Sequence, residues 1–112
     1  MAKTFCISLF DLRTGVTEAD YETLFGDPKN WPVSPPGLTW TMVKGDRGAR
    51  KGRYALVGEF DSKETRDRLF PIEGGGISDE AIAAKWQPFF EAMARLTDWD
   101  ESVTWTDYVA LG

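Results

Sequence analysis

The order of its apolar patterns restricts this chain to few folds. Four stretches alternate apolar and polar residues as half-buried strands do, and three stretches between them repeat apolar residues at helical spacing. The strand patterns cover residues 4–12, 38–44, 53–60 and 102–111, and the helical patterns cover 17–25, 61–70 and 78–96. The predicted order is therefore strand, helix, strand, strand, helix, strand, with the second helical connection in two pieces.

Local signals support these helices and the loops between them. Thr17 can cap the first helix, because a hydroxyl at that position accepts a hydrogen bond from the first turn of the backbone. Four of the six prolines fall between residues 27 and 37, which excludes a continuous helix or a central strand there. Pro88 lies inside the longest helical pattern and is expected to kink or divide that helix.

This order predicts the split strand–helix–strand arrangement of ferredoxin-like folds, an α+β class. Right-handed crossovers place the helices on one face of a four-stranded antiparallel sheet, in a single domain that spans residues 1–112. The opposite face is expected to carry seven residues: Cys6, Phe10, Thr41, Val43, Val57, Thr106 and Tyr108. Such an apolar-to-neutral face needs a covering partner, and a second copy of the chain in a twofold contact predicts a homodimer.

Composition excludes several classes of protein. The net charge of −5 disfavours nucleic acids and anionic membranes as partners. The chain has no histidine and a single cysteine, Cys6, which removes the usual zinc and haem sites and any intrachain disulfide. No signal peptide or membrane span is expected, and one thiol suits a reducing cytoplasm. We therefore expect no metal and no cofactor.

Four segments of the sequence resemble the dimeric α+β barrel superfamily, specifically the antibiotic-biosynthesis-monooxygenase-like and stress-responsive A/B-barrel proteins. These segments are residues 5–10, 54–62, 86–96 and 106–109. The resemblance covers nearly the whole chain. It implies a barrel formed by the sheets of two protomers, with a small-ligand pocket between each sheet and its helices.

The chain departs from that superfamily at its catalytic positions. Cofactor-independent monooxygenases and haem-degrading members use an asparagine on the first strand, where this chain has Cys6 and Ser8. Its single asparagine, Asn30, falls in a loop, and the histidine–tyrosine pair of polyketide-cyclase members lacks its histidine here. The resemblance therefore implies a fold and a pocket rather than a mechanism.

Three of the five tryptophans fall on positions that should face inward. Trp40, Trp86 and Trp105 lie on strands or on the long helix, and their indole surfaces suit flat aromatic ligands. Gly58, within a predicted central strand, leaves room for a ligand or for a packed ring. We predict substrate binding by these four residues; the alternative is that large rings simply fill the core of a small domain.

Three carboxylates, Asp11, Glu59 and Asp107, lie inside strand patterns. A buried carboxylate can serve as acid or base, with a tyrosine donating to a developing oxyanion. Our catalytic candidates are Asp107, Tyr108 and Tyr54. Because neighbours on a strand point to opposite faces, only one of Asp107 and Tyr108 can enter a given pocket. The alternative is that these carboxylates pair with arginines or face solvent.

Residues 44–53 concentrate five of the 13 basic residues around three glycines. This loop could hold an anion such as a phosphate or a carboxylate, but its spacing matches no phosphate-loop signature, and a solvated hairpin tip is the favoured interpretation because basic residues are common in exposed loops. Cys6 is interpreted as a core thiol, because no histidine is present to generate a thiolate.

Three interpretations of function follow. The first is a small, cofactor-free enzyme that acts on an apolar or aromatic metabolite in a pocket between sheet and helices. The second is a noncatalytic barrel that binds a small ligand or serves as a scaffold. The third is a cofactor-independent monooxygenase, which would consume oxygen with a quinol-like substrate.

Overall fold

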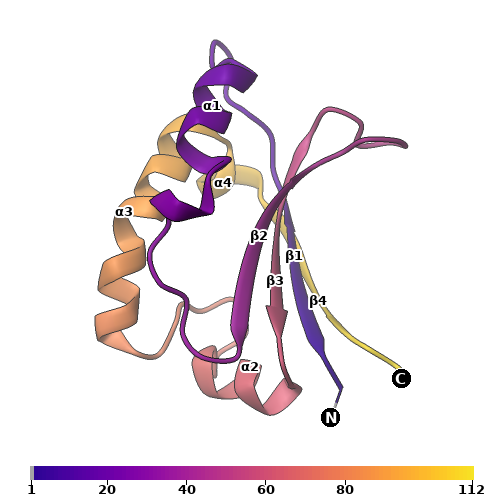
Figure 1. The fold of residues 1–112 in the computed structure, drawn as a ribbon, viewed down its shortest axis with the longest axis vertical. Coiled ribbons are helices and arrows are strands. Elements are labelled where there is room, and N and C mark those ends of the chain that lie inside the picture. The colour runs from indigo at the N-terminus through magenta and orange to yellow at the C-terminus, as the bar shows by residue number, and fades with distance from the viewer. Residues whose placement is uncertain (1) are drawn as a thin grey trace.

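The computed structural model describes residues 2–112 as one four-stranded antiparallel sheet with its helices on one side (Figure 1). The strands lie in the order β2-β3-β1-β4, with β1 at Thr4–Leu9, β2 at Leu38–Lys44, β3 at Tyr54–Phe60 and β4 at Thr104–Val109. The helices are α1 (Glu18–Phe25), α2 (Lys63–Leu69), α3 (Glu80–Leu96) and α4 (Trp99–Ser102), with a 3-10 turn, η1, at Pro28–Asn30. This topology confirms the predicted ferredoxin-like α+β class.

Side-chain caps explain where three helices begin. Thr17 and Ser62 each accept a hydrogen bond from the backbone N–H three residues ahead, at the starts of α1 and α2. The carboxylate of Asp79 accepts from two backbone N–H groups of the next turn. Asp79 therefore starts α3 at Glu80, slightly later than the sequence pattern predicts.

Helix α3 continues through Pro88. The sequence predicted a kink or a division at this residue, but the helix is not divided. Proline removes one backbone donor, so the carbonyl of Ala84 loses its helical partner. Both residues are exposed, which lets water bond that carbonyl, while the buried side chains of Phe89 and Met93 hold the helix on the sheet.

The sequence patterns do not reveal α4, because four residues are too few to show a helical period. Because α4 extends to Ser102, β4 begins at Thr104, two residues later than the sequence pattern predicts. The carboxylate of Asp98 accepts hydrogen bonds from the backbone N–H of Asp11 at 2.8 Å and from the hydroxyl of Ser102 at 2.7 Å. These bonds tie α4 to the segment that follows β1.

Strand register assigns the side chains of the sheet to two faces. The uncovered face carries Phe5, Ile7, Leu9, Thr39, Thr41, Val43, Ala55, Val57, Glu59, Thr104, Thr106 and Tyr108. We call this set the open face. Placing Cys6 and Phe10 there was wrong: both lie on the helix-covered side, where Phe10 is 2% exposed. In β1 the more apolar face, with Phe5, Ile7 and Leu9, is the one that the helices leave uncovered, so alternation alone does not indicate which face is covered.

The core lies between the sheet and the helices α1 and α3. Its buried members are mostly aromatic: Phe10, Tyr21, Phe25, Tyr54, Leu56, Trp86, Phe89 and Met93. A smaller cluster of Leu38, Phe60 and Leu69 lies beneath α2. The larger cluster fills one end of the covered face, whereas toward the other end, beside the smaller cluster, β1 contributes only the small side chains of Thr4, Cys6 and Ser8.

Candidate functional site

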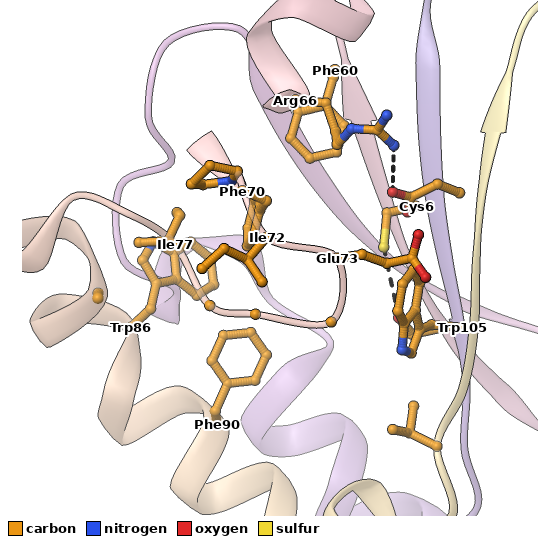
Figure 2. Close-up of a pocket in the computed structure, with 18 of the residues that line it drawn as sticks. Cys6, Phe60, Arg66, Phe70, Ile72, Glu73, Ile77, Trp86, Phe90 and Trp105 are labelled. Atoms are coloured by element: carbon orange, nitrogen blue, oxygen red, sulfur yellow. Dashed lines mark hydrogen bonds and ion pairs between the residues drawn. The ribbon is translucent and has the colours of Figure 1, made fainter. Parts of the chain in front are cut away.

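A cavity of about 1220 Å³ opens between the covered face of the sheet, α3 and the segment that joins α2 to α3 (Figure 2). Strands β1 and β4 supply its floor, and Figure 2 shows Trp86 and Phe90 on the α3 side opposite Trp105 on the β4 side. The cavity is partly open to solvent. A molecule of drug-like size would fit this space.

One row of residues crosses the sheet at the floor of the cavity. The paired registers of the four strands align Trp40, Gly58, Cys6 and Asp107, from one edge of the sheet to the other. The neighbouring row ends on β4 at Trp105. Because the two central strands contribute only a glycine and a cysteine to the first row, space remains above the sheet.

Gly58 lies against the ring of Trp40. A Cβ built on Gly58 would come within 2.7 Å of ring carbon Cζ3 of Trp40, which is closer than real contacts allow. The absent side chain therefore lets the indole lie flat on β3, from where it approaches Trp86 of α3 with a ring-centroid distance of 6.4 Å. The room at Gly58 is taken by a side chain of the protein itself.

The segment between α2 and α3 covers the cavity with few side chains. Gly74, Gly75 and Gly76 all line the cavity and contribute only backbone. Gly74 has φ +75°, a conformation that other residues rarely adopt, and a Cβ there would lie 3.9 Å from the Trp105 ring. The side chain of Ile72 also lines the cavity, yet it is 71% exposed. The cavity stays open because its cover lacks bulk.

Arg66 and Asp107 form an ion pair at the polar end of the cavity. Arg66 Nη1 donates to Asp107 Oδ2 at 2.5 Å, and Arg66 Nε donates to Asp67 Oδ1 at 2.8 Å. The side chains of Arg66 and Asp107 are 18% and 25% exposed, so the pair is shielded from water. The bonds to Asp67 and Asp107 raise the pKa of the Arg66 guanidinium.

The thiol of Cys6 lies beside this pair. Its burial, together with the charge of Asp107, raises its pKa to about 11. Cys6 Sγ lies 4.0 Å from the hydroxyl oxygen of Ser8. At neutral pH the side chain is therefore a protonated thiol, which can donate a weak hydrogen bond but does not act as a nucleophile.

The three tryptophans predicted to bind substrate all line the cavity. Trp86 is buried and donates its indole N–H to the carbonyl of Val33 at 3.3 Å. Trp40 is half-buried between Gly58 and Trp86. Trp105 is 41% exposed, and the ring pairs within residues 2–112 include none with Trp105. Its indole face is available to a ligand.

Of the three catalytic candidates, the structure brings only Asp107 to the cavity. Tyr54 belongs to the aromatic core and donates its hydroxyl to Glu22 Oε2 at 2.5 Å. Burial and the neighbouring carboxylate of Glu22 raise the pKa of Tyr54 to about 12. Tyr108 is 53% exposed on the open face, opposite to Asp107, as strand alternation requires.

The other strand carboxylates and the basic loop are paired with each other or with nearby charges. Asp11 accepts from Arg53, which lowers the pKa of Asp11, and it also lies 3.9 Å from Arg50. Glu59 lies 3.6 Å from Lys3 on the open face. The tip of residues 44–53 extends away from the helices in Figure 1, and none of these residues lines the cavity.

Neither a metal centre nor a membrane span emerges from the part of the chain that the structure describes. In residues 2–112, no three histidine, cysteine, aspartate or glutamate side chains gather as metal ligands. None of the helices in the same range is both long and apolar enough to cross a membrane.

Three charged residues of the cavity, Arg66, Asp67 and Glu73, were not predicted from the sequence. Arg66 shares a helix face with Leu69, three residues later, and with the cap residue Ser62, and both of those are buried. The helical period therefore places Arg66 at a core-facing position, and this could have identified it as a residue of the cavity. Glu73 lies in an irregular segment, where no period indicates which way a side chain points.

Comparison with known proteins supports the fold. No family model matches the chain, and no curated protein sequence matches it. Among solved structures, it is similar to a dimeric protein of unknown function with a ferredoxin-like fold from Bacteroides fragilis. The two chains are 16% identical, the match covers 95% of this chain and 94% of the other, and the TM-score is 0.53. This likeness supports the ferredoxin-like fold alone.

Proposed function

We propose that this protein binds a small apolar or aromatic molecule in the cavity between sheet and α3. The observation that carries the proposal is the half-exposed indole of Trp105, which faces Trp86 and Phe90 across an open space (Figure 2). A ring placed there would exclude water from three aromatic surfaces at once. Fully burying a large aromatic group favours binding by a few kcal/mol, roughly enough for millimolar affinity.

The proposal includes assembly as a dimeric α+β barrel, with residues 1–112 as its one domain. The open face presents Phe5, Ile7, Leu9 and Val57 toward solvent, and its one acidic residue, Glu59, is close to Lys3. Threonines on β2 and β4 flank this apolar centre. Such a face is self-complementary across a twofold axis, and the similar Bacteroides fragilis protein is dimeric. A single buried thiol suits a cytoplasmic location for the assembly.

Catalysis by Asp107 is a second candidate function, favoured because its carboxylate lines the cavity. A cofactor-free enzyme would use this group to accept a proton, with Arg66 holding it in place. The third interpretation is a cofactor-independent monooxygenase. At the floor of the cavity this chain has Cys6 and Ser8, where such enzymes have an asparagine. Oxygen uptake with a quinol would support it, and absence of uptake would reject it.

Native mass spectrometry of freshly purified protein tests binding. We expect the dimer to retain a small aromatic molecule, and Trp105→Ala to lose it while remaining dimeric. Trp31 packs outside the cavity against Phe89 and serves as the matched control: Trp31→Phe should keep the ligand. Equal retention by wild type and Trp105→Ala would reject the assignment of this cavity.

The same extracts separate binding from catalysis. An enzyme that depends on Asp107 would release product from the wild type and accumulate substrate in Asp107→Asn, so the extracted masses would differ. A protein that only binds its ligand would retain a molecule of the same mass in the wild type and in Asp107→Asn.

Sedimentation tests the dimer. Val57→Lys places a charge at the centre of the open face and should shift the mass to that of one 12.6 kDa chain at micromolar concentration. Ala84→Lys, at an exposed position of α3, should leave the dimer intact. A wild-type protein that sediments as a monomer would overturn the barrel.

A further inference from the structure

We propose that the cavity selects positively charged aromatic molecules, namely aromatic amines, over neutral or acidic molecules of the same shape; this inference rests on the proposed binding function. The cavity combines exposed indole surface with an excess of carboxylates. Each of these features attracts a cation, and they do so by independent physical effects.

The first feature is the charge of the lining. Three carboxylates, Asp67, Glu73 and Asp107, line the cavity, against a single cation, Arg66. Arg66 is already engaged with Asp67 and Asp107, so its charge is shared between two partners. A ligand carboxylate would therefore meet a net negative site.

Glu73 is the carboxylate that a ligand cation can reach. The ion pairs within residues 2–112 include none made by Glu73. Figure 2 draws its side chain directed toward Trp105 and Cys6. The neighbouring Gly74 confirms that this segment approaches β4, because a Cβ there would lie 3.9 Å from the Trp105 ring.

The second feature is the exposed face of Trp105. Trp86 and Phe90 have neighbouring rings, whereas the 41% exposed indole of Trp105 has none in the described part of the chain. A cation over an indole face is attracted by the ring quadrupole, most strongly for tryptophan. An ammonium group between Glu73 and Trp105 would gain both interactions, while the ligand ring would lie toward Phe90 and Trp86.

Isothermal titration with three phenyl probes tests this preference. The probes are phenylbutylamine, phenylbutanol and phenylbutyrate, which share a ring and an alkyl chain and differ in charge. We expect the amine to bind about tenfold more tightly than the alcohol, and phenylbutyrate to bind more weakly than both. Added salt should reduce the advantage of the amine and leave the alcohol unchanged, because Glu73 is exposed.

A matched pair of variants assigns the preference to Glu73. Glu73→Gln should reduce the amine-to-alcohol ratio about threefold, whereas Glu64→Gln, which neutralises an exposed carboxylate of α2 outside the cavity, should leave it unchanged. Three results would overturn the inference while leaving the binding function intact: equal binding of all three probes, tightest binding of phenylbutyrate, or an amine-to-alcohol ratio that is the same in Glu73→Gln as in the wild type. Failure of every probe to bind would overturn both.

Discussion

The two ends of the covered sheet face use the same strands but fill their space differently. At one end Tyr54 rises from β3 and Phe10 from the residue after β1, and both rings meet Tyr21 of α1. Toward the other end the same two strands present Ser8, Cys6 and Gly58, beneath a segment containing three consecutive glycines. A well-packed end and an open end on one sheet show that side-chain size, rather than topology, creates the cavity.

Truncating one aromatic side chain at each end should give the largest difference in stability. Phe10→Ala removes a ring that is 2% exposed and should lower the free energy of unfolding by about 3–5 kcal/mol, because the surrounding core cannot collapse into the void. Trp105→Ala, at the open end, should cost about 1 kcal/mol or less. Urea unfolding at one fixed protein concentration measures both. A similar decrease in the free energy of unfolding for the two variants would contradict the difference in packing between the two ends.

A glycine pair sharpens the comparison. Gly58→Ala places a methyl group 2.7 Å from the Trp40 ring, so the ring must shift, at a cost of about 1–3 kcal/mol. Gly76→Ala adds the same methyl group where nothing lies within 4 Å, and it should be close to neutral. Thermal unfolding of the two variants distinguishes them, and equal midpoints would show that Trp40 does not lie on Gly58.

At the packed end, the hydrogen bond from the Tyr54 hydroxyl to Glu22 should make stability depend on alkaline pH. Its folded pKa of about 12 exceeds the ordinary value, so the stability it provides is complete below about pH 10 and is lost as pH rises toward 12. Tyr54→Phe removes the bond to Glu22 and should cost about 1 kcal/mol at neutral pH. The variant should also show a flatter alkaline loss of stability. An unchanged alkaline profile would mean that Tyr54 is solvated.

The smallest expected effect concerns the reactivity of Cys6 at the open end. With a pKa of about 11, roughly one thiol in a thousand is ionised at about pH 8, so alkylation by iodoacetamide should be slow. Asp107→Asn removes a negative neighbour and should speed alkylation several-fold by lowering the pKa. Asp67→Asn, which removes a carboxylate bound to the other side of Arg66, serves as the control and should change the rate less. A faster reaction in Asp67→Asn than in Asp107→Asn would contradict the placement of Cys6.

The fold was largely predictable from the sequence because its signals are local. Alternation located all four strands, and the hydroxyl of Thr17 located the start of α1. Alternation did not identify the covered side of Cys6 and Phe10, because the more apolar face of β1 points away from the helices, and the covered face is decided by helices that pack from elsewhere in the chain.

The candidate site was predictable only in part. Trp40, Trp86, Trp105 and Asp107 are large or charged residues in regular elements, so their inward direction follows from a period. Tyr54 lies in the core rather than at the cavity, because its strand position fixes a face but not which part of that face it occupies. The pairing of Arg66 with Asp107 joins residues 41 positions apart, and only the folded chain reveals it.

Fluorine NMR of protein labelled with fluorotryptophan can locate a ligand in the cavity, since each of the five indoles gives one resonance. On saturation with phenylbutylamine, we expect the largest shift for Trp105, smaller shifts for Trp40 and Trp86, and the least for Trp31, which lies outside the cavity. A spectrum that does not change, or one in which Trp31 moves most, would contradict a ligand site at the open end.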